Sequence, residues 1–91
     1  MKESELGRVY SEGEVIFQEG EEGDRMYVVQ SGRVRITKKT PSGEIPIAIL
    51  EEGEIFGEMA LFDRLPRSAT ASVIGNTRIL GIDKKKLFQS I

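Results

Sequence analysis

The chain has 91 residues, 38% of them apolar and 31% charged, which is typical of one small globular domain. Its formal net charge of −2 disfavours a nucleic-acid-binding surface, and the absence of cysteine and histidine excludes disulfides and removes the commonest general base and metal ligand. No apolar run approaches the roughly 18 residues of a membrane span, and the N-terminus lacks a signal-peptide core. We therefore expect a cytoplasmic protein that has no membrane contact and is not an enzyme.

Short runs of strand-forming residues, separated by glycine turns, predict a mainly β protein. The first strands are expected at Arg8–Tyr10 and Val15–Phe17. An acidic, glycine-rich stretch over Gln18–Arg25 follows and is typical of a solvated hairpin loop. Met26–Gln30 is the next strand and is expected to be buried.

The middle of the chain carries two turn signals. Ser31-Gly32 predicts a tight turn before Arg33–Lys39, where alternating apolar and charged residues indicate a strand with one buried face. Pro41-Ser42-Gly43 favours a turn into a further strand over Glu44–Leu50. Within that strand Pro46 favours an edge position or a bulge, because proline cannot donate a hydrogen bond to a neighbouring strand.

The C-terminal part predicts two more strands and a helix. Ser68–Ile74 and Thr77–Ile82 are the expected strands, and Gly75-Asn76 between them is a hairpin signal. Asp83 then fits the N-cap of a short helix that includes the last residues of the sequence.

Residues 56 to 71, FGEMALFDRLPRSATA, interrupt the β pattern. Glu58–Phe62 are good helix formers after Gly57, so one helical turn is expected there, with free N–H groups at its start that favour an anion. Arg67 follows, and its guanidinium suits a phosphate, whereas Arg64 is expected in a solvated loop. Because Glu58 can accept a hydrogen bond from a hydroxyl, the segment predicts a pocket for an anion that also carries hydroxyl groups.

This segment resembles the phosphate-binding cassette of cyclic-nucleotide-binding domains, of the catabolite activator protein and protein kinase A regulatory subunit type. The similarity extends over roughly residues 11 to 88. It implies an eight-stranded antiparallel β-roll, jelly-roll-like, with a short helical turn in the cassette and a partial C-terminal helix. It also implies a single domain over residues 1–91 that ends before the family's C-terminal lid helix.

The resemblance also implies roles for individual residues. Arg67 would pair with the cyclic phosphate, and Glu58 would bind the ribose 2′-hydroxyl. Gly57 and Ala60 would offer backbone N–H groups, and Ser68 would reach a phosphate oxygen. The ligand-binding set that we expect is Gly57, Glu58, Met59, Ala60, Arg67, Ser68, and, as base contacts, Ile36 and Ile47.

Several alternatives stay open at this point. Ile36 and Ile47 fit core positions as well as base contacts. The expected ligand is cAMP, with cGMP as the alternative, and no cofactor or metal is expected. An effector domain or a second copy of the chain would be the protein partner. The chain could instead be a degenerate β-roll that docks other proteins, or the sensory part of a DNA-binding transcription regulator.

Overall fold

The computed structural model describes residues 6–59 and 65–89 of the chain. Within these ranges the fold is mainly β, as predicted, with six antiparallel strands, a short C-terminal helix and two further helical residues at Glu58 and Met59. The strands are β1 (Arg8–Tyr10), β2 (Val15–Phe17), β3 (Arg25–Thr40), β4 (Gly43–Leu50), β5 (Ile55–Phe56) and β6 (Thr70–Asp83), and the helix is α2 (Lys84–Gln89).

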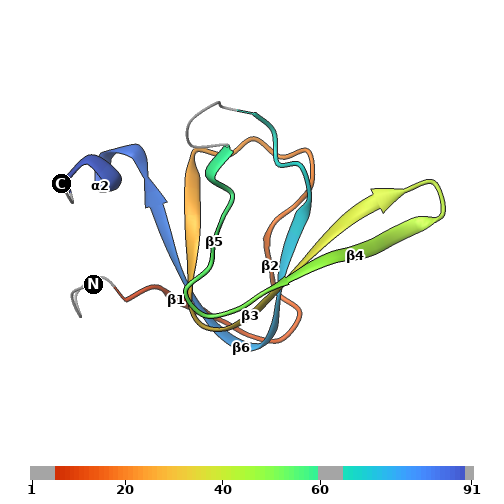
Figure 1. The fold of residues 1–91 in the computed structure, drawn as a ribbon, viewed down its shortest axis with the longest axis horizontal. Coiled ribbons are helices and arrows are strands. Elements are labelled where there is room, and N and C mark those ends of the chain that lie inside the picture. Colours follow the sequence, from red (N-terminus) through yellow and green to blue (C-terminus); the bar gives the residue numbers. More distant parts are fainter. Residues whose placement is uncertain (1–5, 60–64, 90–91) are drawn as a thin grey trace.

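The two long strands β3 and β6 lie at the centre of the sheet. The strand order is β1-β6-β3-β4, while β2 adds to β6 and β5 adds to β3, all antiparallel. Figure 1 shows β3 and β6 turning together at the lower edge of the view, so that each strand contributes to both sides of the roll. A single pair of bent strands thus encloses the interior.

The predicted turns at Ser31-Gly32 and Gly75-Asn76 were wrong. The strands continue through both sites, and the register shifts there from Ser31↔Arg78 to Arg33↔Ile74. Gly32 lies at φ +88°, so glycine allows a bulge that bends the strand without reversing it. Two predicted pairs of strands are therefore single strands, and β5, which was not predicted, is added. The seven strands expected from the sequence pattern thus become six in the described residues, and the family resemblance implied eight.

The corner of the roll is closed by Thr77. Its side chain is 1% exposed, and its hydroxyl accepts a hydrogen bond from the Arg33 N–H at 3.3 Å. The same hydroxyl lies 3.2 Å from the carbonyl oxygens of Arg33 and Ile74, to one of which it donates. This side chain ties the two bent strands together where their register changes.

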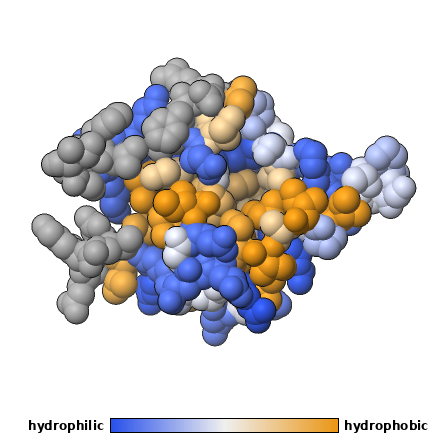
Figure 2. Space-filling model, in the orientation of Figure 1, coloured by the Kyte–Doolittle hydropathy of each residue, from blue (hydrophilic) through white to orange (hydrophobic). Residues whose placement is uncertain are grey.

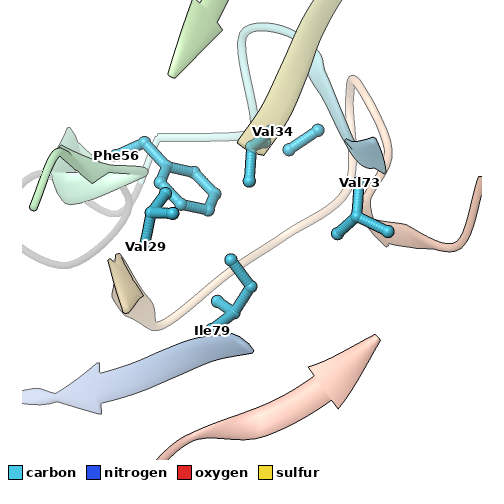
Figure 3. Packing of buried hydrophobic residues seen from close by; sticks show 6 residues of the cluster. Val29, Val34, Phe56, Val73 and Ile79 are labelled. Atoms are coloured by element: carbon cyan, nitrogen blue, oxygen red, sulfur yellow. The ribbon is translucent and has the colours of Figure 1, made fainter. Parts of the chain in front are cut away.

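The hydrophobic core lies between the two sides of the roll. Figure 3 shows Val29, Val34, Phe56, Val73 and Ile79 pointing into the same interior. They come from both arms of β3 and β6 and from β5, and each is at most 6% exposed. Burial of this cluster therefore stabilises the bend as well as the sheet.

The arm formed by β3 and β4 confirms the prediction for Pro46. β4 is at the edge of the sheet, and its register changes between Ile36↔Ala48 and Thr37↔Pro46, which leaves Ile47 as the bulged residue. Ile47 is 54% exposed, so it is not a core residue. Figure 2 shows a band of apolar surface across the middle of the face in view.

The C-terminal helix begins as predicted. Asp83 Oδ1 accepts a hydrogen bond from the Lys86 N–H at 2.8 Å, which is the geometry of an N-cap. Before β6, the chain bends at Ser68 and Ala69, so the strand begins at Thr70 rather than at the predicted Ser68. None of the described helices has the length and apolar character needed to cross a membrane.

Candidate functional site

A cavity of about 350 Å³ opens where the predicted cassette meets the sheet, and this size is in the range of small-molecule sites. Most of its wall is apolar, while Glu58, Arg67 and Ser68 supply polar groups. Its lining residues are Phe17, Ile36, Leu50, Ile55, Phe56, Gly57, Glu58, Met59, Leu65, Pro66, Arg67, Ser68 and Ala69. The structure thus brings six of the eight predicted ligand-binding residues to one cavity.

The first part of the cassette is anchored by β5. Phe56 is 6% exposed and pairs with Tyr27 of β3. The sheet therefore fixes the position at which the next residues of the cavity lining begin. Gly57 follows at φ +78°, and a Cβ on it would lie 2.7 Å from Nη1 of Arg67. Only glycine meets both conditions without strain.

The helical turn expected over Glu58–Phe62 is confirmed at its first two residues. Glu58 and Met59 are helical, and both are exposed at the cavity. Ala60, which was expected to offer a backbone N–H, lies outside the described residues, as does Arg64.

Arg67 is the most unusual residue of the site because its side chain is charged and yet only 6% exposed. Its Nη1 donates to the Gly57 carbonyl and its Nη2 to the Arg25 carbonyl, both at 3.0 Å. Nε is buried without a hydrogen-bond partner, and no carboxylate of the described residues forms an ion pair with the guanidinium. A buried cation is normally paired with an anion, so the unpaired charge of Arg67 indicates a site for an anionic ligand.

The loop before β3 holds the backbone of Arg67. Gly20 N–H donates to the Arg67 carbonyl at 2.7 Å, and Arg67 N–H donates to the Glu21 carbonyl at 2.8 Å. A Cβ on Gly23 would lie 2.4 Å from Nε and Nη2 of Arg67, so a side chain there would displace the guanidinium. The Gln18–Arg25 stretch is therefore more than the solvated loop that its composition predicts.

Aromatic side chains cover the guanidinium. The Cζ atom of Arg67 lies 4.2 Å from the ring centroid of Phe17 and 5.5 Å from that of Tyr27. Phe17, Tyr27 and Phe56 form a cluster with ring centroids 5.4–5.9 Å apart. Burial raises the pKa of the Tyr27 hydroxyl above its ordinary value, although the positive charges of Arg67 and Arg25 oppose this shift.

Ser68 is exposed at the cavity, and its carbonyl accepts a hydrogen bond from Lys38 Nζ at 2.7 Å. Lys38 also lies 3.5 Å from a carboxylate oxygen of Glu19. Glu19 accepts a hydrogen bond from the Lys39 N–H at 2.9 Å, and mainly this bond lowers the pKa of the Glu19 carboxyl. The backbone of Ser68 is thus tied to β3, while the residue as a whole stays exposed.

The two isoleucines expected to contact a base are separated by the fold. Ile36 is half-buried and lines the cavity, whereas Ile47 does not line it. Phe17 lines the cavity but was not predicted as a site residue. In a three-residue strand the apolar sequence Val-Ile-Phe does not reveal which side chain faces the site.

The site combines a buried cation, an accessible carboxylate and an apolar wall. These groups suit a ligand that has an anionic group, a hydroxyl group and a flat apolar part. Among the described residues, no group of three or more aspartates and glutamates is placed to hold a metal ion.

Comparison with protein families gives one match, which covers nearly the whole chain. The family model described as "Cyclic nucleotide-binding domain" matches residues 7–91.

Individual relatives agree with this match. Over 79 residues the chain is 37% identical to the CRP-like cAMP-activated global transcriptional regulator of Mycobacterium tuberculosis, covering 86% of this chain and 35% of that protein. It is 35% identical to the cAMP-dependent protein kinase regulatory subunit of Dictyostelium discoideum, covering 85% of this chain and 25% of that protein. The chain therefore spans about a third or less of the length of these relatives.

The fold agrees with that of solved structures. The cAMP-bound form of the EAL enzyme Bd1971 is 38% identical, with a TM-score of 0.82, over 91% of this chain and 23% of that chain. A cGMP-bound form of the same enzyme matches with the same identity and TM-score, over 22% of that chain.

Proposed function

The chain belongs to the cyclic nucleotide-binding domain family, of the type found in CRP-like regulators and protein kinase regulatory subunits, and from this premise we propose that it binds a 3′,5′-cyclic nucleotide as a regulatory module. The observation that carries the proposal is Arg67, a buried cation in the cavity lining that has no anionic partner among the described residues. A cyclic phosphate would supply the missing negative charge.

The other polar groups fit the rest of the nucleotide. Glu58 begins the helical turn beside Gly57 and lines the cavity, which supports our proposal that its carboxylate accepts a hydrogen bond from the ribose 2′-hydroxyl. The N–H groups at the start of this turn, including those proposed for Gly57 and Ala60, would face the phosphate. Ser68 would contact a phosphate oxygen or the base.

The apolar wall would receive the base. Ile36, Leu50 and Ile55 lie along it, and Met59 stands at its edge, 52% exposed. The proposed site omits Ile47, because this residue does not line the cavity. Since Ile55 and Met59 leave part of the wall open to solvent, we expect an affinity on the order of micromolar or weaker.

We further propose that cAMP is preferred over cGMP by less than tenfold. The relatives named above include a cAMP-activated regulator and a cAMP-dependent protein kinase regulatory subunit, whereas the enzyme Bd1971 has been solved with either nucleotide. Ser68 is the hydroxyl side chain at the cavity, and one neutral hydrogen bond contributes only about 0.5–1.5 kcal/mol. Discrimination by Ser68 alone is therefore weak.

The proposed module is not itself catalytic and passes its signal to an effector domain or to a second copy of the chain. Its relatives have different functions: one is a transcription regulator and another is a kinase regulatory subunit. Nucleotide binding in the cavity would be compatible with either function.

Isothermal titration calorimetry with cAMP and cGMP tests the proposal. We expect a stoichiometry of one nucleotide per chain, since the chain has one cassette. 5′-AMP is the matched control, because it shares the base and ribose but lacks the cyclic phosphate. If neither cyclic nucleotide binds at millimolar concentration, the chain is a β-roll that has kept the cassette for docking or structure.

A further inference from the structure

The ring of Phe17 lies against the guanidinium of Arg67, with 4.2 Å between Cζ and the ring centroid. β2, which carries Phe17, is only three residues long, and it pairs with β6 with a shift in register between Val15 and Phe17. From this contact we infer that Phe17 is a positioning residue, which holds Arg67 in the conformation that receives the phosphate. The inference rests on the proposed function.

Phe17 is itself held in place. Its ring centroid lies 5.7 Å from that of Tyr27 and 5.9 Å from that of Phe56. Tyr27 and Phe56 are directly paired residues on β3 and β5, and Phe56 is 6% exposed. A ring fixed by two neighbours on the sheet offers the guanidinium a rigid surface.

The electrostatic setting makes this contact stronger than a surface one. Arg67 is 6% exposed, and within the described residues its charge meets two backbone carbonyls and aromatic rings but no carboxylate. Cation–π attraction grows when the cation is shielded from water. The ring therefore stabilises the buried charge without neutralising it, which leaves Arg67 able to attract an anion.

Positioning follows from the flexibility of arginine. A free arginine side chain loses much rotamer entropy when it binds a ligand, and this loss weakens binding. The carbonyls of Gly57 and Arg25 fix two nitrogens, and Phe17 covers the planar group itself. Arg67 is thus ordered before the ligand arrives, and the entropic cost falls on folding rather than on binding.

The first experiment measures cAMP affinity of Phe17→Leu by calorimetry at a temperature where each variant is folded. We expect a loss of about three- to tenfold. Phe17→Tyr keeps the ring and should stay within twofold of the wild type. Ile16→Ala is the matched control, since Ile16 is the neighbouring residue on β2, packs against the core and does not line the cavity. Its melting temperature should fall while its affinity is unchanged.

A double-mutant cycle separates positioning from simple packing against the nucleotide. In an Arg67→Gln background, followed by NMR titration because binding is weak, Phe17→Leu should change affinity by less than twofold. If the same three- to tenfold loss appears in that background, Phe17 acts on the ligand directly and the inference is overturned. An unchanged affinity of Phe17→Leu in the wild-type background overturns it too.

A measurement without ligand keeps this inference separate from the proposed function. The Nε–H signal of Arg67, assigned by its absence in Arg67→Gln, should be displaced by the ring current of Phe17 and should move in Phe17→Leu. If the signal moves but no cyclic nucleotide binds the wild type, the proposed function fails while the contact stands. If the signal does not move, Phe17 does not hold the guanidinium and the inference fails whatever binds.

Discussion

Replacing Arg67 by alanine should weaken cAMP binding by about 50- to 150-fold. A hydrogen bond to a charged group contributes about 1.5–3 kcal/mol, which corresponds to about 10- to 150-fold in affinity. Arg67 is only 6% exposed, so solvent screens its charge little and the upper part of this range applies. The matched control is Arg35→Ala, because Arg35 is exposed on β3 and does not line the cavity.

The substitution also changes stability, and the assay must allow for this. The carbonyls of Gly57 and Arg25 lose their donors in Arg67→Ala, while the cost of burying an unpaired charge disappears. These effects oppose each other, so we expect a decrease of about 1–2 kcal/mol in the free energy of unfolding. Calorimetry is therefore done well below the melting temperature of the variant. An affinity within threefold of the wild type, or an equal loss in Arg35→Ala, would refute the placement of the phosphate at Arg67.

Four further outcomes are expected. Glu58→Ala should remove the preference for cAMP over 2′-deoxy-cAMP, which we expect to be about tenfold in the wild type, the low end of the range for a charged partner because Glu58 is exposed; competition titrations measure this ratio. By the same assay, Ser68→Thr should shift selectivity toward cGMP and Ser68→Ala toward cAMP, whereas an unchanged ratio would show that Ser68 does not read the base. The Glu19 carboxyl should titrate by NMR below its ordinary pKa of 4.5. Its contribution to stability is complete above pH 4.5 and is lost as the pH falls through the lowered pKa. The difference in melting temperature between the wild type and Glu19→Gln should therefore shrink over that acidic range. Thr77→Val should lower the free energy of unfolding by about 1–3 kcal/mol in a thermal melt and leave cAMP affinity unchanged, since the corner lies outside the cavity lining.

Local sequence patterns predicted the parts of the fold that depend on nearby residues. The strands Arg8–Tyr10 and Val15–Phe17 and the N-cap at Asp83 are where the sequence places them. Gly75-Asn76 misled the prediction because this pair is equally good for a hairpin and for a bulge. The partner strand decides between the two, through the register shift and the hydroxyl of Thr77.

The residues of the candidate site show the same difference between local and long-range contacts. The cassette is one continuous segment, so Gly57, Glu58 and Arg67 could be predicted together from their order. Phe17 could not, because its contact with Arg67 joins residues 50 positions apart in the sequence. The same is true of Gly20 and Glu21, whose backbone groups bond to Arg67 across a similar separation.

Thermal unfolding of the wild type and Arg67→Ala, each with and without 1 mM cAMP, is the most direct test of cyclic-nucleotide binding through Arg67. A ligand at about 100 times its Kd stabilises the folded state by about 2.7 kcal/mol, which raises the Tm of a domain this small by roughly 10 °C or more. We predict this rise for the wild type, and little or none for Arg67→Ala, with 5′-AMP inactive on both. An unchanged Tm of the wild type in cAMP and in cGMP would contradict the account, as would an equal rise in the two proteins.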